Sequence, residues 1–180
     1  MFDNYPVEHD ELRSRHEKAI AQRFIRKYNE AKKNNFVFKQ RGKPPAPDFE
    51  YKDSTTDKVI SLEVTGIYYD EHQAEGTWQV ARGNIKRFQS NIVAYPTELL
   101  RKFIEDSIAK KCQKIYDFSH PITLVLDATR PPVHDERDIE DIEEMVKQMQ
   151  LPDQIPFHEI YFGIRLSQYR IWKLYPRKSD

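Results

Sequence analysis

Residues 47–65 read PDFEYKDSTTDKVISLEVT and predict two β-strands joined by a turn. The middle of this stretch, residues 53–57, consists of short polar residues that favour a turn. The strand after it alternates between its two faces, as a strand with one buried face does. We therefore expect an antiparallel hairpin between residues 48–52 and 58–65. One face of its second strand is expected to carry Ile60, Leu62 and Val64.

The sequence around the hairpin predicts an α/β protein with the element order α-β-β-β-α-β and further elements at the carboxyl end. Residues 121–127 form a nearly continuous apolar run, which is typical of a central strand covered on both faces. Residues 66–96 give no clear pattern apart from a short helix expected near 80–92. The other elements are expected as helices at 8–33, 98–116 and 137–150 and as strands at 36–40, 158–166 and 170–175.

Composition limits the class of protein. The chain has 180 residues, of which 38% are hydrophobic and 32% charged, as in an ordinary soluble domain. The single cysteine, Cys112, excludes a disulfide framework and a cysteine-rich zinc module. No apolar run approaches the roughly 20 residues of a membrane span, and the first residues lack the order of a secretory signal. We expect one cytoplasmic domain over residues 1–180, with no membrane partner.

Charge is unevenly distributed, although 29 basic and 29 acidic residues balance to zero. Residues 13–43 hold 11 Lys or Arg against two acids, whereas residues 135–144 hold seven acids against one base. The basic run is either a phosphate-facing surface or a solvated helix face. If it faces phosphate, DNA is the expected partner. The candidate contacts are Arg41, Lys43, Arg82 and Lys86.

Glu17 breaks the apolar stripe of the first helix. Ile20, Phe24 and Tyr28 define that stripe at helical spacing, and Glu17 projects into its middle. A carboxylate on a core face is unfavourable unless it is paired, hydrogen-bonded or bound to a metal. The alternative is that Glu17 lies close enough to the helix start to reach solvent.

The hairpin carries a second pair of acids. Glu63 interrupts a β-branched, apolar strand, and Asp48 opens the neighbouring strand. Antiparallel pairing can bring the two carboxylates within a few ångströms, as Mg²⁺ or Mn²⁺ requires. Without a cation the carboxylates repel each other and one pKa rises. The alternative is two solvent-facing acids on an edge hairpin.

The element order together with Pro47-Asp48, Glu63-x-Thr65 and Glu17 resembles the PD-(D/E)xK nuclease superfamily. The resemblance implies a restriction-endonuclease-like αβββαβ core, a mixed central sheet flanked by helices, with carboxyl-terminal additions. It also implies Mg²⁺ (or Mn²⁺) and hydrolysis of DNA phosphodiester bonds. Asp48 would be the central metal ligand, Glu63 the second, and Glu17 would assist them.

The third position of the motif, usually Lys, is Thr65 here. A hydroxyl cannot supply the positive charge that this lysine gives to phosphate or nucleophile. Members of the superfamily can carry the lysine on another element, and Lys111 projects into the stripe formed by Leu100, Ile104, Ile108 and Ile115. Lys111 is the first candidate and Lys52 the second. Alternatively, the aliphatic part of the Lys111 side chain only covers the core while its ammonium group reaches solvent.

Three functions remain open from the sequence. The first is a metal-dependent nuclease, in which Asp48, Glu63 and Lys111 are the catalytic residues. The second is a catalytically degenerate module of the same fold that binds DNA or a protein partner. The third is an unrelated α/β domain, in which Glu17 and Glu63 would lie far apart. A homodimer is compatible with the first.

Overall fold

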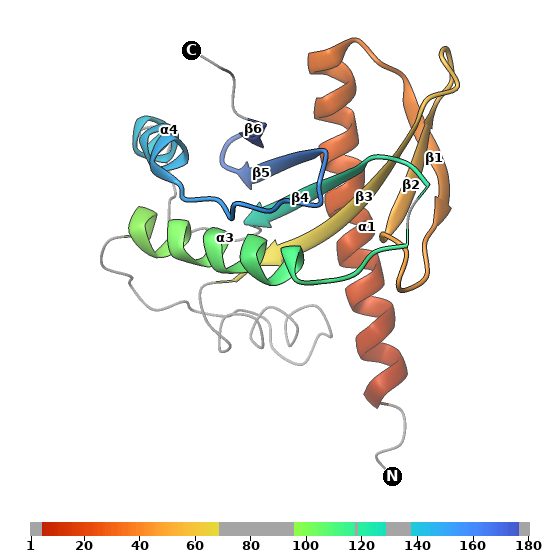
Figure 1. The fold of residues 1–180 in the computed structure, drawn as a ribbon, viewed down its shortest axis with the longest axis horizontal. Helices are drawn as coiled ribbons and strands as arrows, with labels where there is room; N and C mark the ends of the chain where they lie inside the picture. Colours follow the sequence, from red (N-terminus) through yellow and green to blue (C-terminus); the bar gives the residue numbers. More distant parts are fainter. Residues whose placement is uncertain (1–4, 69–95, 118, 129–137, 177–180) are drawn as a thin grey trace.

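A computed structural model describes residues 5–68, 96–117, 119–128 and 138–176, without the side chains of residues 5–10 and 96 (Figure 1). Its described part is an α/β structure with one mixed sheet of six strands in the order β1-β2-β3-β4-β5-β6. The prediction of an α/β fold with a mixed sheet is therefore confirmed. The short helix expected near 80–92 lies outside the described residues. The strands are β1 (Phe36–Arg41), β2 (Phe49–Asp53), β3 (Val59–Ile67), β4 (Ile122–Ala128), β5 (Glu159–Arg165) and β6 (Tyr169–Tyr175).

The sheet combines an antiparallel meander with a parallel centre. Strands β1, β2 and β3 pair antiparallel in succession, while β3, β4 and β5 are parallel, and β6 returns antiparallel to β5. Both parallel pairs need a connection that crosses over the sheet, and helices supply it. The two carboxyl-terminal strands, which the sequence predicted at 158–166 and 170–175, extend the sheet.

Helices cover both faces of the sheet (Figure 1). Helix α1 (Tyr5–Lys32) packs on one face, in a cluster that includes Phe24, Leu62 and Val125. Helices α3 (Pro96–Cys112) and α4 (Ile139–Gln148) belong to the cluster on the other face, with Leu124 and Leu126. Since alternate residues of β4 enter different clusters, every residue of this strand is buried. The prediction of a central strand is confirmed.

The hairpin turn between β2 and β3 forms as its polar residues predicted. Asp53 Oδ1 accepts hydrogen bonds from the backbone nitrogens of Thr55 and Thr56, at 2.8 and 2.9 Å. Asp57 adopts a positive φ of 59°, which Asp tolerates better than most residues. The resulting register pairs Phe49 with Leu62.

Helix α3 ends earlier than the sequence pattern indicated. It stops at Cys112, and the Lys114 nitrogen donates to the Lys111 carbonyl at 3.2 Å, an i to i−3 bond that tightens the end. Ile115 is consequently 90% exposed instead of joining the buried stripe. Tyr116 takes the inner position because its ring packs against Phe157, with ring centroids 5.6 Å apart. No helix among the described residues is long and apolar enough to cross a bilayer.

Candidate active site

Asp48 and Glu63 come together where β2 begins. The register that pairs Phe49 with Leu62 sets Asp48 opposite Glu63 if it is continued by one residue. Asp48 Oδ2 accepts a hydrogen bond from the Val64 backbone nitrogen at 2.8 Å. This hydrogen bond holds the Asp48 carboxylate against β3, the strand that carries Glu63.

Glu63 meets the lysine that the helix pattern selected. The Glu63 side chain is 6% exposed, and Lys111 Nζ donates to its Oε1 at 2.5 Å. Lys111 is itself only 13% exposed, whereas its neighbour Lys110 is exposed. Lys114 Nζ lies 3.9 Å from the same Glu63 oxygen. Lys111, near the end of α3, and Lys114, just beyond it, therefore approach a carboxylate in the middle of the sheet.

Lys52, the second candidate from the sequence, lies elsewhere. Its Nζ pairs with Asp57 Oδ1 at 2.7 Å, and both side chains are exposed at the turn between β2 and β3. Lys52 is four residues along β2 from Asp48, which is about 13 Å in an extended strand.

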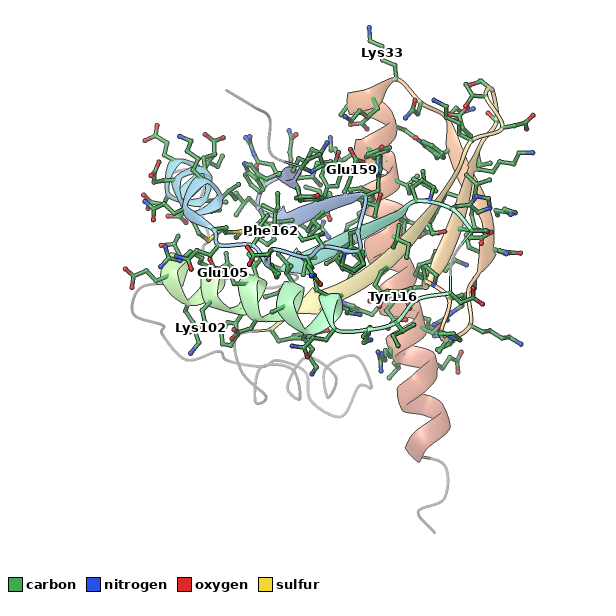
Figure 2. The ribbon with its side chains drawn as sticks, viewed as in Figure 1. Lys33, Lys102, Glu105, Tyr116, Glu159 and Phe162 are labelled. Carbon is green, nitrogen blue, oxygen red and sulfur yellow. The ribbon has the colours of Figure 1, made fainter. Side chains whose placement is uncertain are left out.

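The two carboxylates influence each other electrostatically. Burial and the negative charge of Glu63 raise the pKa of Asp48 from 3.8 to about 6, although the Val64 hydrogen bond and Lys111 oppose the rise. Burial and then Lys111 lower the pKa of Lys114. Tyr116, on the segment after α3 (Figure 2), has a pKa raised by burial and then by Glu63. At neutral pH an ionised Asp48 is therefore held beside the Glu63–Lys111 pair in a partly dehydrated place.

Glu17 also lies near Asp48, since its charge contributes to the raised pKa of that residue. Its side chain is 13% exposed, so it is largely but not fully covered, between the two alternatives that the sequence left open. The counter-charge comes from two arginines. Arg13 Nε lies 2.9 Å from Glu17 Oε1, and an Arg41 terminal nitrogen lies 3.1 Å from Oε2.

A cleft of about 450 Å³ opens beside Asp48. Two of the predicted nucleic-acid contacts, Arg41 and Lys43, line it together with Arg13. The other two predicted contacts, Arg82 and Lys86, lie outside the described residues. Acidic and basic groups therefore share one cleft, with Asp48 as part of its wall.

The donor set fits a divalent cation of the Mg²⁺ type. Mg²⁺ is commonly held by one or two carboxylates, with water and substrate phosphate oxygens completing its ligands. Asp48 and Glu63 supply two carboxylates whose repulsion a cation would relieve; burial first and then the charge of Glu63 raise the pKa of Asp48. No group of three or more His, Cys, Asp or Glu side chains in the described part of the chain is arranged to hold a metal.

Three residues near this site were not predicted from the sequence, namely Arg13, Lys114 and Tyr116. Arg13 precedes Glu17 by four residues on one helix, so the i, i+4 rule could have found it. Lys114 and Tyr116 lie beyond the end of α3, where helical periodicity no longer applies.

No family model matches the chain. No curated protein and no solved structure matches it either. A function is therefore inferred from the geometry of the residues.

Proposed function

We propose that the chain is a metal-dependent nuclease that hydrolyses DNA phosphodiester bonds. The observation that carries the proposal is the contact of 2.5 Å between Lys111 Nζ and Glu63 Oε1, beside Asp48. An acid, a second acid and a lysine are the residue types of the PD-(D/E)xK motif. Here the lysine would come from α3, which compensates for Thr65.

The arrangement of elements supports a restriction-endonuclease-like core. Helix α1, the meander β1-β2-β3, helix α3 and strand β4 follow the αβββαβ order of that superfamily. Strands β5 and β6 would be additions to it. The acids lie on β3 and at the start of β2, and Glu17 lies on α1, which are the elements where the family carries such residues.

Each residue would have a distinct role. Bound Mg²⁺ supplies positive charge to the scissile phosphate and lowers the pKa of the attacking water. Asp48 and Glu63 would hold it, and the Val64 hydrogen bond orients Asp48 for this purpose. Lys111 would orient Glu63 and present its ammonium charge to the phosphate, where charge develops during hydrolysis.

The proposal is tested by cleavage of plasmid and single-stranded DNA with Mg²⁺ or Mn²⁺. Cleavage is expected in either metal, and both EDTA and Asp48→Asn should abolish it. Lys111→Met should lower the rate by about a hundredfold. The matched control is Lys110→Met, which removes the adjacent exposed lysine and should leave the rate unchanged.

A second function is favoured by the same ion pair. Lys111 already neutralises Glu63 without a metal, as a catalytically degenerate module that binds DNA or a protein would allow. For such a module, Asp48→Asn should leave DNA binding intact and increase stability by removing repulsion. Absence of cleavage by the folded protein on every substrate, with retained binding, would replace the nuclease proposal with this one.

A further inference from the structure

Glu17 joins two arginines that come from different elements. Its Oε1 contacts Arg13 of α1 at 2.9 Å, and its Oε2 contacts Arg41, the last residue of β1, at 3.1 Å. The carboxylate is 13% exposed, whereas the Arg13 and Arg41 side chains are 64% and 46% exposed. An inner carboxylate thus holds two outer guanidinium groups.

Arg41 is fixed by more than this ion pair. Its guanidinium carbon lies 5.7 Å from the ring centroid of Phe49, within the range of a cation–π contact. The loop that follows is closed by a hydrogen bond of 2.9 Å from the Gly42 nitrogen to the Asp48 carbonyl. A Cβ at Gly42 would overlap the Pro47 carbonyl oxygen, so this closure requires glycine. The position of Arg41 is therefore set by the Phe49 ring and by the closed loop that follows it.

Both arginines line the cleft that contains Asp48, and Lys43 adds a third cation. Guanidinium groups offer planar, paired donors that match the oxygens of phosphate. The volume of about 450 Å³ lies within the usual range for small-ligand pockets. The chemistry of the cleft therefore suits a backbone phosphate with its sugar.

We infer that Glu17 is a positioning residue that holds Arg13 and Arg41 as a phosphate clamp. The clamp binds a nucleic-acid phosphate next to the one attacked at Asp48 and Glu63. This inference rests on the proposed nuclease function. It gives Glu17 a role different from the metal ligand that the sequence suggested, because both of its oxygens already contact arginine.

Glu17→Gln separates these roles by the sign of its effect on binding. The variant removes a negative charge from the cleft, so a purely repulsive Glu17 would give tighter DNA binding when it is lost. A positioning Glu17 would give weaker binding, because the arginines lose their anchor. A metal ligand would leave binding in EDTA unchanged and weaken the response to Mg²⁺.

The measurement is fluorescence anisotropy of a labelled DNA oligonucleotide in EDTA over a range of salt concentrations. Arg41→Gln should weaken binding about tenfold and reduce the salt slope by about one. Glu17→Gln should weaken binding severalfold despite its gain in net charge. Arg41→Lys, which keeps the charge and loses the planar fork, should bind with intermediate affinity.

The matched control for Glu17→Gln is Glu30→Gln on the same helix, where the glutamate pairs with Lys27 at 2.9 Å away from the cleft. Circular dichroism and thermal unfolding of each variant establish that it is folded. Equal or tighter binding by Glu17→Gln, or unchanged binding by Arg41→Gln, would overturn the clamp. If Mg²⁺ shifts the melting temperature of Glu17→Gln as much as that of the wild type, the clamp is supported. If the shift is lost in the variant, the clamp is overturned.

Binding in EDTA does not depend on hydrolysis, so the two proposals can fail separately. Clamp-dependent binding without cleavage would contradict the nuclease and retain the clamp. Cleavage that needs Asp48 but is accompanied by normal binding of Glu17→Gln would contradict only the clamp. An RNA oligonucleotide of the same sequence forms a parallel arm. Dependence on Arg41 with RNA alone would overturn the clamp for DNA.

Discussion

Two glutamates in the sheet each contact a lysine, yet their surroundings differ. Glu63 lies on β3 with Lys111 at 2.5 Å, and Glu159 begins β5 with Lys173 at 2.8 Å. Both carboxylates are buried, with side chains 6% and 9% exposed. Judged by burial and pairing alone, the two positions are equivalent.

The second hydrogen-bonding partner distinguishes them. Glu159, which is labelled in Figure 2, also accepts a hydrogen bond from the Tyr28 hydroxyl of α1, at 3.0 Å. Burial alone would raise the pKa of Glu159, but the bonds from Lys173 and Tyr28 outweigh it and lower that pKa. Around Glu63, by contrast, a second carboxylate is present, and the pKa of Asp48 rises to about 6.

A buried glutamate–lysine pair is therefore not by itself evidence of a functional site. Glu159 is satisfied by donors that belong to the fold, so its charge is already balanced. Asp48 and Glu63 are two neighbouring carboxylates, and Asp48 borders a cleft through which a cation could reach them.

The largest expected effect is on cleavage. Glu63→Gln should reduce the rate about a thousandfold, because it weakens both metal binding and the placement of Lys111. Glu159→Gln, the matched change at the other pair, should leave the rate unchanged. Initial rates on supercoiled plasmid in Mg²⁺ measure both. Equal losses in the two variants would show that the pairs do not differ in function.

The next effect is on stability. Lys111→Met leaves Glu63 buried without its closest cation and should lower the free energy of unfolding by about 3 kcal/mol. This is the low end of the range for breaking a buried ion pair, because Lys114 lies 3.9 Å from Glu63. Lys173→Met should cost about 1 kcal/mol, since Lys173 is 29% exposed and Tyr28 remains bonded to Glu159. Urea unfolding measures both values. A smaller loss of unfolding free energy in Lys111→Met than in Lys173→Met would contradict the proposed difference between the two pairs.

The pH dependence of stability has opposite signs at the two places. The pKa of Asp48 rises from 3.8 to about 6 on folding, so the folded protein binds this proton more tightly than the unfolded chain. Its stabilising contribution is present below about pH 4 and is lost as pH rises through 6, by about 3 kcal/mol. Glu159, with a lowered pKa, instead contributes stability above its ordinary pKa and loses it on acidification.

Urea unfolding between pH 3 and 7 checks these signs in the wild type, Asp48→Asn and Glu159→Gln. Relative to Asp48→Asn, the wild type should lose stability as the pH rises over this range. Relative to Glu159→Gln, it should lose stability as the pH falls. A parallel dependence in all three proteins would show that neither carboxylate shifts on folding.

The smallest effect is expected at the exposed Lys52–Asp57 pair. Lys52→Ala should change the free energy of unfolding by less than about 0.5 kcal/mol, because both side chains are solvated. It should also leave cleavage unchanged, since Lys52 lies at the hairpin turn. A loss of cleavage comparable to that of Lys111→Met would instead make Lys52 the lysine of the site.

Much of the fold could be predicted because its signals are local. The hairpin follows from alternation and the polar turn at residues 53–57, and β4 follows from its apolar run. The end of α3 could not be predicted, because it depends on the contact of Tyr116 with Phe157, 41 positions further along the chain. Ile115 fitted the helical pattern and is nevertheless exposed.

The candidate site shows the same division. The proximity of Asp48 and Glu63 follows from hairpin pairing, and the inward position of Lys111 follows from helical periodicity. The contact of Glu17 with Arg41 could not be predicted in this way, because it depends on where the end of β1 lies relative to α1. Sequence periodicity locates a residue on its own element, whereas such contacts depend on how elements pack.

The hydrogen bond from the Val64 nitrogen to Asp48 has a consequence for how the site assembles during folding. It joins residues 16 positions apart, so formation of the β2-β3 hairpin suffices to make it. The Lys111–Glu63 contact spans 48 positions and awaits the docking of α3. Local contacts close sooner than distant ones, so the two acids come together first, and the lysine joins them only when the helix is in place. During synthesis residues 48 and 63 also emerge before Lys111, so the lysine is the last of the three to become available.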